Sequence, residues 1–181
     1  MGVPVNSLAS PRFCGVRPFQ RLPYSADCSG NDFAVLGVPF DTATSYRPGC
    51  RFGPAAIRDA SSILKSYHSV LDVDIFEHCQ GVDAGDVDII PGYLDESFER
   101  IEAAVAVIMG GDHSITLPEL RAVAKRHGPV ALLHFDAHSD TGDDFFGKPY
   151  NHGTTFHWAI EEGLILPEQS TQAGIRGPLY S

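Results

Sequence analysis

The stretch of residues 132–140 reads Leu-Leu-His-Phe-Asp-Ala-His-Ser-Asp, and its character changes in the middle. The apolar run Val130–Phe135 is typical of a buried strand. Polar residues then follow at alternate positions, and alternate side chains of an extended segment point the same way. These residues are Asp136, His138 and Asp140. Ligands of parallel α/β sheets bind beyond the carboxyl ends of strands, and carboxylates with imidazole suit a divalent metal, so the pattern predicts a metal site here.

A second apolar run, Val105–Met109, ends in a similar way, because Gly-Gly-Asp-His follows it at positions 110–113. The paired glycines permit a tight turn and a close approach of the backbone to a neighbour. If the two strands are neighbours in one sheet, His113 joins the other three side chains as a fourth ligand. Asp112 is interpreted as a turn residue or as a residue that supports the ligand next to it.

Other apolar and turn patterns predict the remaining elements. Pro54 suits the first position of a helix that continues to about Leu64. Asp95 is predicted to cap a helix that runs to Val105. Further expected elements are strands at 33–38 and 172–176 and helices at 114–127 and 154–162.

The motifs at both strand ends resemble those of the ureohydrolases, the arginase and agmatinase enzymes. The resemblance is closest to the agmatinase and guanidinobutyrase branch. It rests on Gly-Gly-Asp-His-Ser at 110–114, Asp-Ala-His-Ser-Asp at 136–140 and Asn-His-Gly-Thr at 151–154, with further similar segments at 37–41, 47–49, 53–58, 83–86 and 173–181. It implies a three-layer α/β/α fold with a parallel sheet and a manganese-dependent hydrolysis of a guanidino compound to urea and an amine.

The resemblance also implies roles for single residues. The expected ligands of two Mn²⁺ ions per complete site are His113, Asp136, His138 and Asp140, and His152 is similar in position to the family's proton shuttle. Three further residues are not predicted to bind a metal. His134, on the strand itself, is interpreted as a satisfied core histidine, and Asp83 and Asp86 as loop and capping carboxylates.

The sequence gives weaker indications of the substrate and of the partners. Asp140 is followed by Thr141-Gly142, whereas true arginases place an Asn nearby that contacts the α-amino acid end. By resemblance this disfavours arginine and favours agmatine, with guanidinobutyrate and formimino-glutamate-type substrates still open. The family also implies a homo-oligomer, a trimer or hexamer, when the enzyme is complete.

The organisation of the chain departs from the family at two places. Residues 1–31 are expected to form an irregular arm, with a disordered leader as the alternative, and residues 32–181 a partial arginase-like α/β domain. A helix runs into a strand near Ala106 without connecting residues. The family's later Asp-x-Asp-x-x-Asp-Pro segment does not occur in the 181 residues. The chain is therefore expected to be an N-terminal, C-terminally truncated portion of such an enzyme, and a second hypothesis is a non-catalytic fragment or pseudoenzyme.

Composition narrows the class of protein. With 43% hydrophobic and 20% charged residues the chain fits an ordinary globular protein, and no apolar stretch is long enough for a membrane span. A net charge of −10 argues against a nucleic-acid surface. The start of the chain does not resemble a secretory signal, and the four cysteines form no C-x-x-C pair. Reduced thiols in a cytoplasmic protein are expected.

Overall fold

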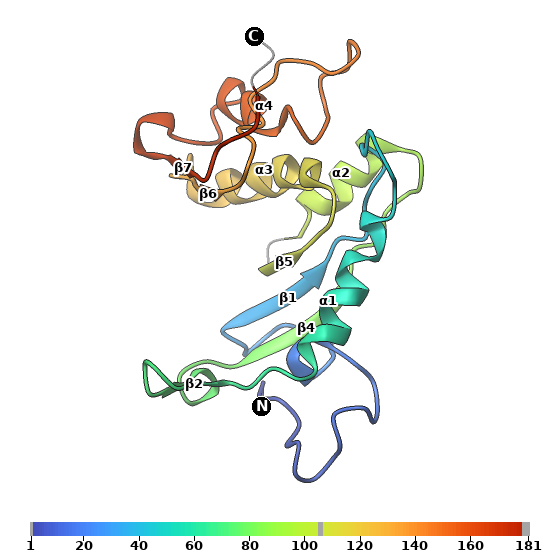
Figure 1. Cartoon of the computed structure of the whole chain (residues 1–181), viewed down its shortest axis with the longest axis vertical. Helices are drawn as coiled ribbons and strands as arrows, with labels where there is room; N and C mark the ends of the chain where they lie inside the picture. The colour runs from blue at the N-terminus through green and yellow to red at the C-terminus, as the bar shows by residue number, and fades with distance from the viewer. Residues whose placement is uncertain (1, 105–106, 179–181) are drawn as a thin grey trace. The chain divides into compact units, whose positions relative to one another are not determined.

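The computed structural model describes residues 2–104 and 107–178. The chain forms two compact units, each assembled from three segments. The first unit contains residues 1–39, 51–87 and 106–111, and the second contains residues 40–50, 88–105 and 112–181. The expected helix-to-strand join at Ala106 lies outside the described residues. Figure 1 labels the α-helices and, except for β3, the strands that are used below.

The first unit is built on a parallel sheet in the order β4-β1-β5. Its strands are β1 (Phe33–Gly37), β4 (Gly81–Asp86) and β5 (Val107–Met109). Leu22, Val35 and Met109 form the buried core of this unit. The other elements are η1 (Phe19–Arg21), η2 (Cys50–Phe52), α1 (Gly53–Ser61), the antiparallel pair β2 (Tyr67–His68) and β3 (Val73–Asp74), and η3 (Ile75–Glu77).

The predicted close approach at the paired glycines is present in this unit. A side-chain Cβ placed on Gly53, at the start of α1, would lie 2.9 Å from the carbonyl oxygen of Gly110. Only glycine therefore fits at the first position of α1, and the helix predicted from Pro54 begins one residue earlier than expected.

The N-terminal arm contains one short 3₁₀ turn, η1, and is anchored on β4. The backbone N–H of Phe19 donates to Asp83 Oδ2 at 2.6 Å, and that of Ser25 donates to the Asp83 carbonyl oxygen at 3.0 Å. Leu22 is 1% exposed, so the arm contributes an apolar side chain to the core.

Asp83 and Asp86 lie on β4 and form ion pairs with Arg58 on α1, so the prediction that they are loop and capping carboxylates was wrong. Arg58 donates to both oxygens of Asp83 at 2.8 and 3.0 Å and to Asp86 at 2.6 Å. Burial alone would raise the pKa of Asp83, but hydrogen bonds from Arg58, Phe19 and Gly85 outweigh it and hold that pKa below its ordinary value. The two acids therefore hold α1 on the sheet and are not available to a metal.

The second unit combines three helices with a parallel pair of strands. Helix α3 (Thr116–His127) packs against both α2 (Leu94–Glu102) and α4 (Thr155–Glu161). Strand β6 (Leu133–Phe135) pairs with β7 (Thr171–Ala173). The 3₁₀ turns η4 (His113–Ile115) and η5 (Pro167–Gln169) complete the unit. The helices and strands predicted here are present, with shorter strands than expected. The prediction that the strand before Asp136 is buried was wrong, since Leu133 is 66% and Phe135 is 74% exposed on β6.

Two local predictions were wrong. Tyr93 occupies the cap position of α2 and no side chain caps that helix, because Asp95 lies inside the first turn. The strands before the two metal motifs are not neighbours in one sheet, since in the described ranges β5 pairs with β1 and β6 pairs with β7. His113 instead approaches Asp136 and Asp140 from the η4 turn that follows β5.

Two further features concern the cysteines and the lengths of the helices. All four cysteines lie within the described ranges, and none of them forms a disulfide. Across residues 2–104 and 107–178, no helix has both the length and the apolar character that crossing a membrane requires.

Candidate metal centre

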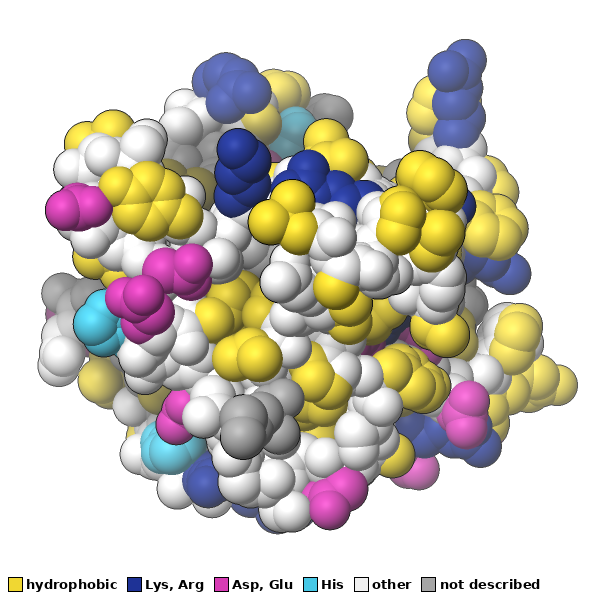
Figure 2. Space-filling model, turned by 90° about the horizontal axis from the view of Figure 1, so that it is seen from below, with side chains coloured by type: hydrophobic (Ala, Val, Ile, Leu, Met, Phe, Trp, Pro, Cys, Tyr) yellow, Lys and Arg dark blue, Asp and Glu magenta, His cyan; other side chains and the backbone are white. Residues whose placement is uncertain are grey.

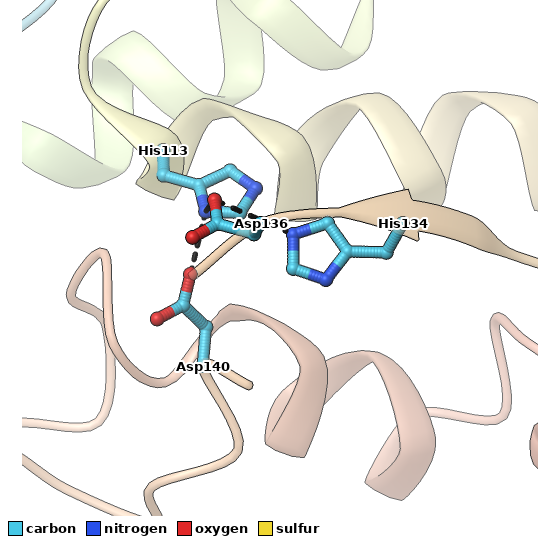
Figure 3. A group of neighbouring side chains, drawn as sticks. All are labelled: His113, His134, Asp136 and Asp140. Atoms are coloured by element: carbon cyan, nitrogen blue, oxygen red, sulfur yellow. Dashed lines mark hydrogen bonds and ion pairs between the residues drawn. The ribbon is translucent and has the colours of Figure 1, made fainter. Parts of the chain in front are cut away.

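Four side chains of the second unit converge at the end of β6 (Figure 3). His113, His134, Asp136 and Asp140 each offer one ligand atom, and these four atoms lie within 4.8 Å of one another. His113 comes from the η4 turn, His134 from β6, and the two aspartates from the loop that follows β6. Three of the four predicted ligands are thus brought together, with His134 as an addition.

Hydrogen bonds to Asp112 and to the backbone of His113 hold the turn that carries the His113 side chain. Asp112 caps the η4 turn by accepting from the Ser114 N–H at 3.0 Å, as its interpretation as a turn residue predicted. The Thr44 hydroxyl donates to the other oxygen of Asp112 at 3.3 Å. The Thr155 hydroxyl on α4 lies 3.3 Å from the His113 carbonyl oxygen. The turn that presents the imidazole is therefore held from two sides.

Asp140 has a left-handed backbone, with φ of +50°. Asp is among the few residues other than Gly that adopt this region readily. The N–H of Phe156 donates to the Asp140 carbonyl oxygen at 2.9 Å, so the start of α4 holds the loop in place. The ring of Phe156 also packs against His113 and His134, with ring centres 5.5 and 4.5 Å apart. One buried aromatic residue thus forms the apolar wall of the group.

The carboxylates stabilise a proton on His113. Nδ1 of His113 lies 2.6 Å from Asp140 Oδ2 and 4.0 Å from Asp136 Oδ2. The hydrogen bond to Asp140 raises the pKa of His113 against the opposing effect of burial, and the charge of Asp136 adds to it. A ligating imidazole must lose this proton, so a divalent cation would take its place between the same atoms. Two carboxylates and one imidazole fit a cation such as Mn²⁺.

His134 is buried as predicted, but the interpretation as a satisfied histidine was wrong at one ring nitrogen. Its Nε2 is buried without a hydrogen-bond partner among the described residues and lies 3.6 Å from Asp136 Oδ2. The Gln172 side-chain nitrogen donates to the Ser139 carbonyl oxygen at 2.8 Å and lies 3.1 Å from His134 Nδ1.

The contacts of Gln172 determine the tautomer of His134. A carbonyl oxygen only accepts, so the Gln172 atom is the amide nitrogen and its second hydrogen points to His134 Nδ1. Nδ1 therefore accepts, and the ring hydrogen is on Nε2, which faces Asp136. At 3.6 Å this nitrogen is too far from Asp136 Oδ2 for a hydrogen bond, so His134 faces the carboxylate without bonding to it.

His138, the fourth predicted ligand, lies outside the group. Its side chain is 64% exposed, and its Nδ1 lies 3.6 Å from Asp136 Oδ1, the carboxylate oxygen other than the one facing His113. Its N–H donates to the same oxygen at 2.9 Å, which lowers the pKa of Asp136. Gly177 passes so close to the imidazole that a Cβ there would overlap it. Asp136 therefore has a histidine on each of its two oxygens.

His152, the predicted proton shuttle, is bound to the Phe40–Cys50 segment. Its Nδ1 lies 3.2 Å from the Ala43 carbonyl oxygen, which also accepts from Asn151 Nδ2 at 2.9 Å. Because a carbonyl only accepts, the Nδ1 of His152 carries the hydrogen and Nε2 is left to take up a proton. The Thr155 hydroxyl lies 3.4 Å from the His152 carbonyl oxygen and also contacts His113, so the two segments meet there.

Glu119 is a charged residue of this region that sequence reasoning missed. It lies in the first turn of α3, and its Oε1 is buried without a hydrogen-bond partner among the described residues. Burial raises the pKa of Glu119 to about 7, against the opposing charge of His113. The signal in the sequence was an acidic residue on the core-facing side of α3. A favourable interaction of that acid with the helix dipole explained it equally well.

We expect Glu119→Gln to stabilise the protein at pH 8 and to leave it unchanged at pH 4. The folded state holds this proton up to about pH 7, whereas the unfolded state loses it near 4.5, so stability falls as the pH rises through that window. At about 1.36 kcal/mol per pKa unit, the gain above pH 7 is roughly 3 kcal/mol. Urea unfolding with a chelator present measures it, with the exposed Glu161→Gln as control. Equal stability of wild type and Glu119→Gln at pH 8 would contradict the prediction.

Comparisons with known proteins give consistent matches. The model of the arginase family matches residues 31–181. Proclavaminate amidinohydrolase from Streptomyces clavuligerus is 41% identical over 96% of this chain and 58% of its own length, and mitochondrial agmatinase from Gallus gallus is 42% identical over 99% and 55%. A solved structure of the Streptomyces enzyme superposes with a TM-score of 0.88 at 42% identity, over 93% of this chain and 59% of that one.

These matches confirm the predicted arginase-like α/β fold with parallel strands. The chain spans about 58% of the length of the first of these relatives. The residues of the converging group all lie within the segment that the family model matches.

Proposed function

This chain belongs to the arginase family, and from that premise we propose that the protein is a manganese-dependent amidinohydrolase of the agmatinase type. It hydrolyses a guanidino compound to urea and an amine. The observation that carries the proposal is the convergence of His113, Asp136 and Asp140 at the end of β6, within one compact unit. Relatives at about 40% identity are named for guanidino or amidino chemistry, including a guanidinopropionase and agmatinases.

The two oxygens of Asp136 suggest how two ions would be held. Oδ2 faces His113, which contacts Asp140, and Oδ1 faces His138. His113, Asp136 and Asp140 would hold one Mn²⁺, and Asp136 with His138 would contribute to the second. A bound cation supplies a water of lowered pKa as the nucleophile for the resonance-stabilised guanidinium carbon.

The proposed role of His152 is to carry a proton to the departing amine. Its Nδ1–H is held by Ala43, so Nε2 is the atom that gains and loses the proton. We expect His152→Gln to lower kcat for urea release by about 10²-fold, which is typical of losing a general acid or base, while Mn²⁺ affinity stays unchanged. The exposed His127→Gln on α3 serves as the matched control. A loss of Mn²⁺ binding together with activity would assign His152 to the metal site instead.

Urea release from a panel of substrates tests the function itself. Agmatine, guanidinobutyrate, guanidinopropionate and arginine are supplied to the folded protein with saturating Mn²⁺. We expect turnover to be fastest with agmatine and slowest with arginine, because Thr141-Gly142 follows Asp140. No urea from any substrate, in protein that is folded and holds Mn²⁺, would support the non-catalytic hypothesis. Assembly as a trimer or hexamer stays a prediction.

A further inference from the structure

The first unit contains a cavity of about 540 Å³ that shares no residue with the metal centre. It lies between residues 3–12 of the N-terminal arm and residues 62–77, and both segments belong to the same unit. Basic side chains on its wall are Arg12, Arg21 and Lys65. Its volume falls within the range of roughly 300–1,000 Å³ that is usual for small-molecule sites.

Two of the basic groups are held close together by one hydroxyl. Arg12 Nε donates to Ser7 Oγ at 3.2 Å, and Arg21 Nη1 donates to the same oxygen at 3.3 Å. The two nitrogens therefore lie no further apart than the sum of these distances, 6.5 Å. Two guanidinium groups at this separation repel each other, and an anion between or beside them relieves the repulsion.

No carboxylate of the described chain neutralises this pair. Within residues 2–104 and 107–178, no acidic oxygen lies within 4.0 Å of the charged nitrogens of Arg12, Arg21 or Lys65. Arg21 is nevertheless only 6% exposed, and its side chain otherwise donates to the Ser10 carbonyl oxygen at 3.0 Å. Buried charges in proteins are normally paired, so the missing partner points to a ligand.

The acids that also line the cavity do not fill this role. Asp74 accepts from the Ser66 hydroxyl at 2.7 Å and from the Phe76 N–H at 3.0 Å, which satisfies both of its oxygens locally. Glu77 lines the cavity beyond 4.0 Å from the basic groups. The positive end of the cavity is thus separate from its acidic side.

The remaining wall is apolar and aromatic. Tyr67 is 51% exposed and Leu64 is 53% exposed, and Phe76 also contributes to the lining. Figure 2 shows basic and hydrophobic side chains side by side at the surface of the chain. A ligand that suits this wall has an anionic head for the arginines and a flat or apolar body for the aromatic side.

We propose that this cavity binds a small organic oxyanion, a carboxylate or phosphate with an apolar body, with Arg12 and Arg21 as its anion-recognising residues. The proposal goes beyond the amidinohydrolase function and does not depend on it. Arg21 also holds the arm through Ser7 and Ser10, so Arg12 is the cleaner position for a test.

Calorimetric titration of the purified full chain with phenyl phosphate and with phenylacetate tests the proposal and separates the two head groups. We expect saturable binding of at least one probe, weakened tenfold or more in Arg12→Gln and in Arg21→Met. Arg17→Gln is the control, because Arg17 pairs with Asp59 at the surface and does not line the cavity. Circular dichroism identifies any variant that fails to fold, in which case Arg12→Gln alone decides.

Three outcomes would overturn the proposal. The first is the absence of saturable binding of either probe, and the second is equal weakening in Arg17→Gln. The third is self-association of the chain, measured by sedimentation, that Arg12→Gln abolishes while neither probe binds. An acidic side chain of a second copy would then be the partner of the arginines.

Discussion

Asp136→Asn is expected to abolish stoichiometric Mn²⁺ binding and to lower urea release by about 10³-fold or more. Both oxygens of Asp136 have a histidine beside them, His113 on one and His138 on the other, and an amide cannot supply charge to either position. A bound metal stabilises the transition state by several kcal/mol, and each 1.36 kcal/mol that is lost lowers the rate about tenfold. Metal content of the gel-filtered protein and kcat under saturating Mn²⁺ are the two measurements.

The matched control for this change is Asp143→Asn, an exposed acid in the loop that follows the group. It should retain wild-type metal content and rate. Metal content and rate are separate readouts, so a wild-type metal content in Asp136→Asn would refute the ligand assignment even if the protein proved inactive. Loss of metal in a protein without activity would support the site and leave the reaction to the substrate panel.

Arg58→Met is expected to lower the free energy of unfolding by about 3–5 kcal/mol, the usual cost of breaking a buried ion pair. The Asp83 side chain is 0% exposed and would lose its charged partner, and the ion pair between Arg58 and Asp86 would be lost as well. Arg17→Met removes a surface pair with Asp59 and should cost less than about 1 kcal/mol. Urea unfolding at pH 7 compares the two variants.

The pH dependence of the Arg58 variant gives a second check. The pKa of Asp83 is held below its ordinary value, so its contribution is present above the unfolded pKa near 3.9 and is lost as the pH falls through the folded pKa. The difference between wild type and Arg58→Met should therefore be largest at neutral pH and shrink below about pH 4. A difference that stays constant into acid would show that packing, and not charge, is what Arg58 contributes.

The metal motifs could be predicted from the sequence because their signals are local. Asp136 and Asp140 do converge after the apolar run, but His138 between them lies outside the group, because the segment after β6 is a loop with a left-handed Asp140 and not the extended segment that the alternation assumed. The helix start at Pro54 and the stop at Gly128, where φ is +77°, depend on single-residue backbone preferences. Such preferences act over a few residues, so they can be recognised in a single sequence without an alignment.

The sheets and the capping of α2 could not be predicted in the same way. Whether β5 pairs with β1 or with β6 depends on hydrogen bonds between segments that are far apart in the chain. Three-residue strands carry too little pattern to specify a partner. At the start of α2, Asp95 has the right residue type, but the first turn begins at Leu94, and a shift of one residue moves a cap into the helix.

The sequence by itself determined the family, the fold class and the identity of most candidate ligands. Only the tertiary structure decided what His134 does, because its tautomer is set by Gln172, 38 residues away. It also paired Asp83 with Arg58 across 25 residues and left Arg12 and Arg21 sharing one hydroxyl without an acid. Charge and hydrogen-bond partners are properties of neighbours in space, and for these side chains the neighbours are not neighbours in the chain.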